Sequence, residues 1–134
     1  MARASQRGAS HWDCGLGRRA DLVGIADKGE IWIVEIKSSI EDFRSDQKWP
    51  EYIPFCDRFF FAVHADFPLE LIPDEAGLIV ADRYGAEQVR AAPLVRMAPA
   101  QRKSVMLRFA RTGAARLHAL YDPENALETR GVHE

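Results

Sequence analysis

The sequence predicts an α/β domain in which helices flank a small mixed β-sheet. Three observations indicate this class: two apolar segments joined by a tight turn between residues 19 and 37, apolar runs at 57–63 and 77–81, and a long helical pattern from Pro99. Strands with few, non-alternating helices are typical of an α/β or α+β sandwich around such a sheet. The 134 residues suit one domain with a buried core.

The domain is expected to occupy most of the chain. Residues 1–17 are rich in Gly, Ser and Arg without a clear period, so we expect a poorly ordered N-terminal segment. The folded domain is predicted over 18–121, and 122–134 form a C-terminal tail.

The first predicted element is a β-hairpin. Its arms, RADLVGIA and EIWIVEIK, are rich in branched apolar residues, and Asp27-Lys28-Gly29 separates them. Glycine suits the left-handed position that a short hairpin loop requires, so Gly29 marks the turn.

A helix is predicted next, over residues 38–49. Ser38 and Glu41 have the spacing of a capping box, in which each side chain satisfies a free backbone N–H at the helix start. Pro50 ends or kinks the helix because it cannot donate to the preceding turn.

Two buried strands and a long helix complete the predicted fold. DRFFFAV at 57–63 and GLIVA at 77–81 are short and apolar, a turn is expected at 83–86, and a strand end at 90–93. The long helix runs from Pro99 to about Leu120. Its expected buried stripe is Val105, Met106, Phe109, Ala110, Leu117 and Leu120.

Composition narrows the function classes. No apolar run is long enough to span a membrane, and the N-terminus lacks the apolar stretch of a signal peptide. The two cysteines, Cys14 and Cys56, are too few for a disulfide scaffold, so a cytoplasmic location is expected. The oligomeric state stays open.

The net charge of −2 hides an uneven distribution. Residues 21–87 carry a net −9, whereas 88–121 carry +7 without a single acid. The basic stretch is either a solvated helix face or a surface that neutralises phosphates. The candidates for contact with a DNA backbone on the helix are Arg102, Lys103, Arg108 and Arg111.

The hairpin also carries candidate chemistry. Glu35 and Lys37 are two apart in a strand and therefore share a face. With a three-residue loop over 27–29, Asp21 lies directly opposite Glu35, with Cβ atoms about 5 Å apart. With a two-residue loop, Asp21 faces Ile36 and the carboxylates lie on different faces. Gly29 favours the first register.

Two opposed carboxylates repel each other when no cation is present. A divalent cation between them attracts both and makes the arrangement favourable. Mg²⁺ accepts such hard oxygen ligands, and Lys37 can hold a water or stabilise charge on a phosphate. The pattern therefore indicates a phosphodiester-hydrolysing centre. A surface ion pair within Glu-x-Lys is the alternative reading of the tripeptide.

The chain resembles a known family at this point. RRADLVGIADKGEIWIVEIKSS and EDFRSDQKWPEY, followed by CDRFFFAVHADFP, GLIVADRYGAE and PAQRKSVMLRFAR, are similar to the MmcB-like DNA repair family of bacteria. That family is placed in the PD-(D/E)xK nuclease superfamily, so the resemblance implies a restriction-endonuclease-like core. The superfamily core usually begins with a helix and a strand, and this chain has only a short segment there, so N-terminal elements are expected to be short or missing.

The resemblance also implies roles for particular residues. Catalytic residues would be Asp21, Glu35 and Lys37, with Mg²⁺ or Mn²⁺ held by Asp21, Glu35 and the carbonyl of Ile36. The following helix would add polar groups, for which the candidates are Asp42, Asp46, Gln47 and Lys48. Besides the long helix, Arg18, Arg19 and Lys48 are candidates for contact with nucleic acid.

Three functions remain as hypotheses. The leading one is a metal-dependent nuclease that acts on DNA in repair. The second is a non-catalytic module on the same fold that binds DNA or a repair-protein partner. The third is a hydrolase of small molecules that uses the same metal.

Overall fold

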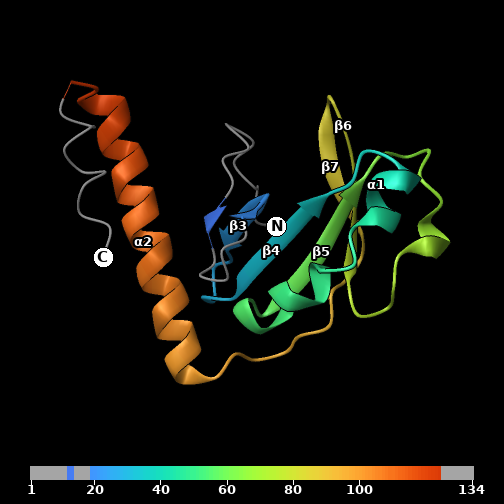
Figure 1. Ribbon diagram of the computed structural model, residues 1–134, viewed down its shortest axis with the longest axis horizontal. Coiled ribbons are helices and arrows are strands. Elements are labelled where there is room, and N and C mark those ends of the chain that lie inside the picture. The colour runs from blue at the N-terminus through green and yellow to red at the C-terminus, as the bar shows by residue number, and fades with distance from the viewer. Residues whose placement is uncertain (1–11, 14–18, 125–134) are drawn as a thin grey trace. The chain divides into compact units, whose positions relative to one another are not determined.

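The computed structural model describes residues 12–13 and 19–124 (Figure 1). The chain forms two compact units, Met1–Ala98 and Pro99–Glu134. The first unit holds the strands and the short helices, and the second holds the long helix.

The first unit is built on a mixed sheet of five strands in the order β3-β4-β5-β6-β7 (Figure 1). The central strand β5 runs parallel to both of its neighbours, whereas β3 and β7 are antiparallel edge strands. The strands are β3 (Leu22–Ile25), β4 (Ile31–Ile36), β5 (Arg58–Val63), β6 (Gly77–Asp82) and β7 (Gly85–Arg90). An open mixed sheet with flanking helices is the predicted fold class.

The hairpin of β3 and β4 has the predicted three-residue loop. Ile25 pairs with Ile31 and Val23 with Ile33, and the N–H of Ala26 donates to the carbonyl of Glu30 at 2.8 Å. Gly29 has φ of 83°, the left-handed conformation that a side chain would strain. The turn therefore fixes which face of β4 each side chain occupies.

One face of the sheet is covered by aromatic packing from two short helices. These are α1 (Ile40–Ser45) and the 3₁₀ helix η1 (Trp49–Phe55). Trp49 stacks on Phe59 with ring centroids 5.7 Å apart, and Phe43 meets Phe61 edge-on at 5.3 Å. These ring contacts pack both helices against β5.

The other face of the sheet has a smaller core. Val34, Phe60, Ala62 and Ala92 are buried together, and the ring of Trp32 lies 4.8 Å from that of Phe60. β5 is therefore buried on both faces, as central parallel strands are.

A close approach in this core requires glycine at the start of β6. A Cβ atom on Gly77 would lie 2.5 Å from the ring of Phe60 and 2.7 Å from the backbone nitrogen of Ala92. Because Gly77 has no side chain, β6 can approach the ring of Phe60 and the backbone at Ala92 closely.

Asp57 and Arg90 hold the loops of this unit to the sheet. The buried carboxylate of Asp57 accepts hydrogen bonds from the N–H of Ile31 at 2.7 Å and of Met97 at 3.5 Å. Arg90 donates to the carbonyls of Pro73 and Ala76, which lie in the loop after the 3₁₀ helix η2 (Leu69–Leu71).

The predicted helix over 38–49 was wrong at both ends. Ser39, not Ser38, is the N-cap: its backbone is extended and its hydroxyl accepts from the N–H of Asp42 at 3.0 Å. The α-helix ends at Ser45, because Asp46 turns to an extended conformation.

Two further strands differ from the sequence-based expectation. Residues 85 and 86 begin strand β7 rather than belonging to the predicted turn, so the strand starts earlier than the end expected at 90–93. The short strand β1 (Trp12–Asp13) was not expected. It pairs with β2 (Arg19–Ala20), two residues that were predicted to belong to the first arm of the hairpin. The rest of the N-terminal segment and residues 125–134 of the predicted tail lie outside the described residues.

The second unit contains α2 (Pro99–Tyr121), whose bounds agree with the predicted helix. Its expected apolar stripe was wrong in large part. Val105 is buried and Phe109 is half-buried, but the other four members are exposed: Met106, Ala110, Leu117 and Leu120. Among the described residues, no helix combines the length and apolar character needed to cross a membrane.

Candidate acidic site on the hairpin

Asp21 and Glu35 come together because of the hairpin register. Leu22, the first residue of β3, pairs with Val34, and the same register continued by one residue places Asp21 opposite Glu35. The prediction that these two acids oppose each other is confirmed, and the alternative register, in which Asp21 faces Ile36, was wrong.

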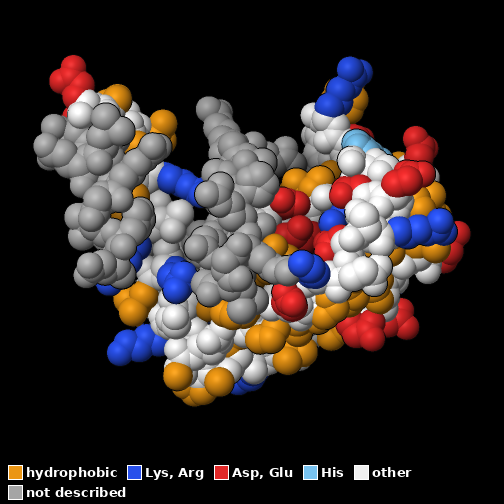
Figure 2. All heavy atoms as spheres, in the orientation of Figure 1, with side chains coloured by type: hydrophobic (Ala, Val, Ile, Leu, Met, Phe, Trp, Pro, Cys, Tyr) orange, Lys and Arg blue, Asp and Glu red, His pale blue; other side chains and the backbone are white. Residues whose placement is uncertain are grey.

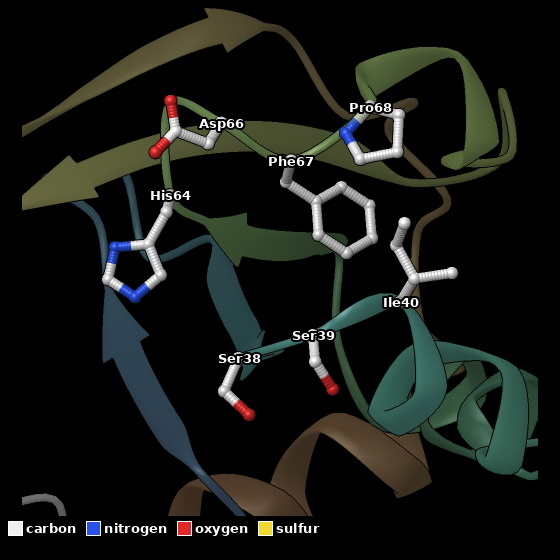
Figure 3. A pocket seen from close by; sticks show the side chains of 7 residues that line it. All are labelled: Ser38, Ser39, Ile40, His64, Asp66, Phe67 and Pro68. Carbon is white, nitrogen blue, oxygen red and sulfur yellow. The ribbon is translucent and has the colours of Figure 1, made fainter.

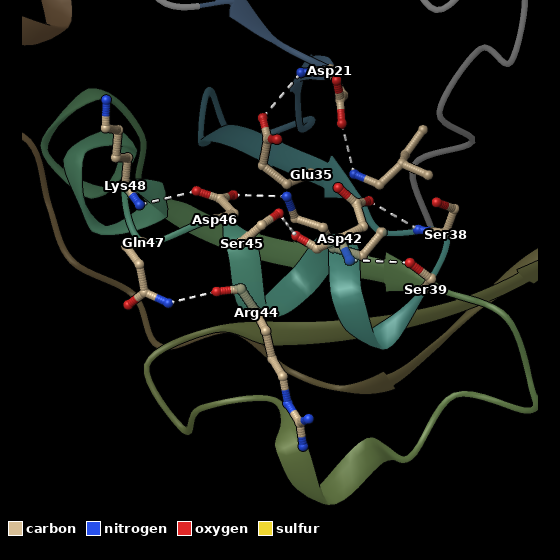
Figure 4. A network of polar contacts seen from close by, with 12 residues as sticks. Asp21, Glu35, Ser38, Ser39, Asp42, Arg44, Ser45, Asp46, Gln47 and Lys48 are labelled. Carbon is tan, nitrogen blue, oxygen red and sulfur yellow. Dashed lines mark hydrogen bonds and ion pairs between the residues drawn. The ribbon is translucent and has the colours of Figure 1, made fainter.

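Two hydrogen bonds hold these residues beside each other (Figure 4). The backbone N–H of Asp21 donates to Oε1 of Glu35 at 3.1 Å. The N–H of Ile36 donates in turn to Oδ2 of Asp21 at 2.9 Å. Each carboxylate is thereby oriented by the backbone of the opposite arm.

Glu35 is a buried carboxylate, only 6% exposed. Burial raises its pKa from the usual 4.5 to about 7, and the negative charge of Asp21 contributes to the rise. The hydrogen bond from the backbone of Asp21 and the positive charge of Lys37 oppose the shift in pKa. At this site a second negative charge is therefore costly unless a cation compensates it.

Lys37 lies on the same face of the chain as Glu35 and is equally buried, at 6% exposure. Its ammonium forms an ion pair with Oδ2 of Asp46 at 2.8 Å (Figure 4). Burial alone would raise the pKa of Asp46, but the hydrogen bond from Lys37 and those from the backbone of Lys48 and Trp49 lower it on balance. Asp46 therefore stays ionised as the partner of Lys37.

The four helix candidates separate into different roles. Only Asp46 reaches Lys37; the carboxylate of Asp42 instead accepts from the N–H of Ser38 at 3.2 Å, closing the turn before α1. Gln47 donates to the carbonyl of Arg44 at 2.7 Å, and the N–H of Lys48 donates to Asp46. Sequence reasoning did not single out Asp46, because that choice depends on the helix ending just before it.

The donor set suits a hard, partly hydrated cation. Within the part of the chain that the structure describes, no group of three His, Cys, Asp or Glu side chains is arranged to hold a metal. Asp21 and Glu35 supply two carboxylates, and the half-exposed Ile36 lies between Glu35 and Lys37 in the strand. Mg²⁺ fits such a set, since it is usually bound through one or two carboxylates and retains several waters.

The predicted nucleic-acid contacts belong to different parts of the chain. Arg18 lies outside the described residues, and of Arg19 only the backbone, in β2, is described. Lys48 is exposed beside Asp46. Arg102, Lys103, Arg108 and Arg111 belong to α2 in the second unit, and Figure 2 shows basic side chains along that helix. The first unit shows several acidic side chains on the same view.

The chain is similar to a known protein family and to one solved structure. Residues 6–124 match the model of a family described as "DNA repair protein MmcB-like". A solved structure, described as the SPO1766 protein of unknown function from Silicibacter pomeroyi, is 50% identical over 86% of this chain and 79% of that one, with a TM-score of 0.81. No curated protein matches the sequence.

Proposed function

The chain belongs to the MmcB-like DNA repair protein family, and from that premise we propose that it hydrolyses phosphodiester bonds of DNA at Asp21, Glu35 and Lys37 with Mg²⁺ or Mn²⁺. The proposal includes membership of the PD-(D/E)xK superfamily, a cytoplasmic location and a place beside a repair-protein partner. The observation that carries it is the pairing of Asp21 with Glu35 across the hairpin, next to the buried Lys37.

The carboxylates and the lysine have separate tasks in this reaction. Asp21 and Glu35, with the carbonyl of Ile36, would hold the cation, whose chemistry is to acidify a bound water and neutralise charge on the phosphate. The Lys37 ammonium has three donors, one of which serves Asp46, so others can orient the water or a phosphate oxygen. The water gives up a proton as its oxygen forms the new bond to phosphorus, the P–O ester bond breaks, and the leaving oxygen takes up a proton, so that one water is consumed for each bond cleaved.

A cleavage assay tests the proposal. Wild-type protein is incubated with labelled single-stranded, double-stranded and branched DNA in Mg²⁺, Mn²⁺ or EDTA. Cleavage is expected in either metal, none in EDTA, and a loss of about a hundredfold or more in Asp21→Asn and Lys37→Met.

Matched controls come from the same hairpin. Asp27 and Lys28 are exposed in its loop, so Asp27→Asn and Lys28→Met repeat the same chemical changes away from the site. These two variants should cleave as wild type does. Activity that survives in Asp21→Asn and Lys37→Met belongs to a contaminant or to another site, and then the assignment fails.

A non-catalytic DNA-binding or partner-binding module on the same fold is the second candidate. One observation favours it: Asp21 and Glu35 each accept a backbone hydrogen bond, which gives them a structural role in closing the hairpin. Salt-sensitive DNA binding without cleavage in either metal is the result expected of such a module.

A further inference from the structure

A cavity of about 280 Å³ lies at the carboxyl ends of the parallel strands β4 and β5 (Figure 3). The N–H of Lys37 donates to the carbonyl of Ala62, which brings the residues that follow each strand beside one another. Ligands of open α/β sheets commonly bind outside the carboxyl ends of the strands. None of the site residues assigned above lines this cavity.

The cavity wall has an apolar side and a polar side. In Figure 3, Ile40, Phe67 and Pro68 gather on one side, and His64 lies across from them. Phe67 is held in place by an edge-on contact with Phe43, with centroids 6.0 Å apart. Such a wall can cover the face of a flat ring.

The polar side of the cavity carries hydrogen-bonding side chains, two of which belong to a hydrogen-bonded turn. His64 and Asp66 are exposed and belong to a turn that the hydrogen bond from Phe67 N–H to the His64 carbonyl closes at 3.0 Å. Ser38 adds a hydroxyl from the end of β4. An imidazole, a hydroxyl and a carboxylate can together recognise the donor and acceptor edge of a nucleobase.

We propose that this cavity binds the base of one unpaired nucleotide next to the phosphate that is cleaved. Ser38 directly follows Lys37 in the chain, so the cavity lies next to the proposed catalytic lysine. The position of the base beside the cleaved phosphate therefore rests on the proposed function. The volume is close to the lower limit of about 300 Å³ for small-molecule sites, so it suits a single base rather than a duplex. The carboxylate of Asp66 disfavours a phosphate, so the base rather than the backbone enters.

The consequence is a preference for DNA with unpaired bases. A base inside a duplex cannot reach a cavity without leaving the stack, which costs a few kcal/mol. A single strand presents its bases without that cost.

Binding in EDTA tests the cavity separately from catalysis. Fluorescence anisotropy is measured with a fluorescein-labelled single-stranded oligodeoxynucleotide and with the duplex of the same sequence. Wild type is expected to bind the single strand more tightly, and His64→Ala and Asp66→Ala should each weaken that binding about tenfold, with changes below about twofold for the duplex.

The sign of the Asp66 effect distinguishes a base contact from general electrostatics. Removal of an acid strengthens DNA binding if only charge matters, so Glu70→Ala, an exposed acid outside the cavity, should leave binding unchanged or slightly tighter. Tighter single-strand binding by Asp66→Ala, or equal changes for both DNA forms, would overturn the cavity assignment.

The two proposals fail separately. Cavity-dependent binding of the single strand without any cleavage would remove the nuclease and keep the base site. Cleavage that Asp21→Asn abolishes, together with unaltered binding by His64→Ala and Asp66→Ala, would keep the nuclease and remove the base site.

Discussion

Glu35 combines two properties that are unfavourable for a carboxylate: it is buried, and it faces Asp21 across the hairpin. Its pKa of about 7 means that its proton is retained well above the pH at which an unfolded glutamate ionises. A cation beside the pair would favour the charged form of both acids, which is the physical basis of the proposed metal site.

The first prediction concerns stability at different pH values without metal. Between pH 4.5 and about 7 the folded chain retains a proton on Glu35 that the unfolded chain has lost. This group therefore stabilises the fold at low pH, and its contribution disappears as pH rises through about 7, by on the order of 3 kcal/mol. Glu35→Gln has no such titration.

Urea unfolding in EDTA measures this effect at pH 5 and pH 8. The free energy of unfolding of Glu35→Gln, relative to wild type, should rise by on the order of 2–3 kcal/mol from the lower to the higher pH. Glu41→Gln, at an exposed position of α1, should show no such rise. A constant difference between Glu35→Gln and wild type would mean that Glu35 titrates normally.

The Lys37–Asp46 ion pair leads to a second prediction at this scale. Both groups are largely buried, at 7% and 18% side-chain exposure, so loss of one leaves the other without its partner. Asp46→Ala should therefore lower the free energy of unfolding by about 3 kcal/mol, more than Asp42→Ala, whose carboxylate accepts one exposed hydrogen bond. If denaturant unfolding gave equal losses of free energy for Asp46→Ala and Asp42→Ala, the buried ion pair would contribute no more to stability than the exposed hydrogen bond.

At the scale of elements, the start of α1 distinguishes two neighbouring serines. Ser39 caps the helix through its hydroxyl, whereas the N–H of Ser38, not its side chain, takes part in the turn. Ser39→Ala should cost about 1 kcal/mol of stability, and Ser38→Ala less than about 0.5 kcal/mol. Thermal unfolding of both variants checks this, and the reverse order would restore Ser38 as the cap.

The elements also show how far the sequence alone predicts this fold. The hairpin register followed from local chemistry, since Gly29 at positive φ selects the loop and the loop selects the register. The start of α1 could not be predicted from local chemistry in this way. Ser38 and Ser39 are the same type of residue, and only the path of the backbone decides which of them caps the helix. The start of β7 was missed because GAEQVR lacks an alternating apolar pattern; its residues are mostly exposed at the sheet edge.

In the candidate site too, the placement of some residues could be predicted from the sequence and that of others could not. The relative placement of Asp21, Glu35 and Lys37 was predictable, because strand periodicity and one turn determine which face each side chain occupies. The choice of Asp46 among the helix candidates was not, because it requires the helix to end at Ser45. The cavity at Ser38 and His64 joins the ends of two strands far apart in sequence, and no local pattern indicates it.

For the whole molecule, the net charge of −2 is a balance between an acidic stretch at 21–87 and a basic one at 88–121. The acids include the proposed metal ligands, and the basic residues of α2 are the proposed phosphate contacts. Such a molecule should bind DNA with modest affinity that depends on salt.

A salt titration of DNA binding tests that distribution. Each phosphate contact that is removed lowers the slope of log K against log salt by about one, so Arg108→Ala/Arg111→Ala should lower it by about two. The control Lys28→Ala/Arg83→Ala removes the same charge from exposed loop positions and should leave the slope nearly unchanged. Equal slopes for both double variants would mean that α2 is a solvated helix without a role in binding.

The proposed nuclease activity requires that Asp21 and Glu35 together hold a divalent cation. Calorimetric titration of Mn²⁺ into wild type, Asp21→Asn and Asp27→Asn measures this directly. Saturable binding near one ion per chain is expected for wild type and Asp27→Asn, with at least a tenfold loss of affinity in Asp21→Asn. Absence of binding to wild type, or equal binding by all three proteins, would contradict the claim.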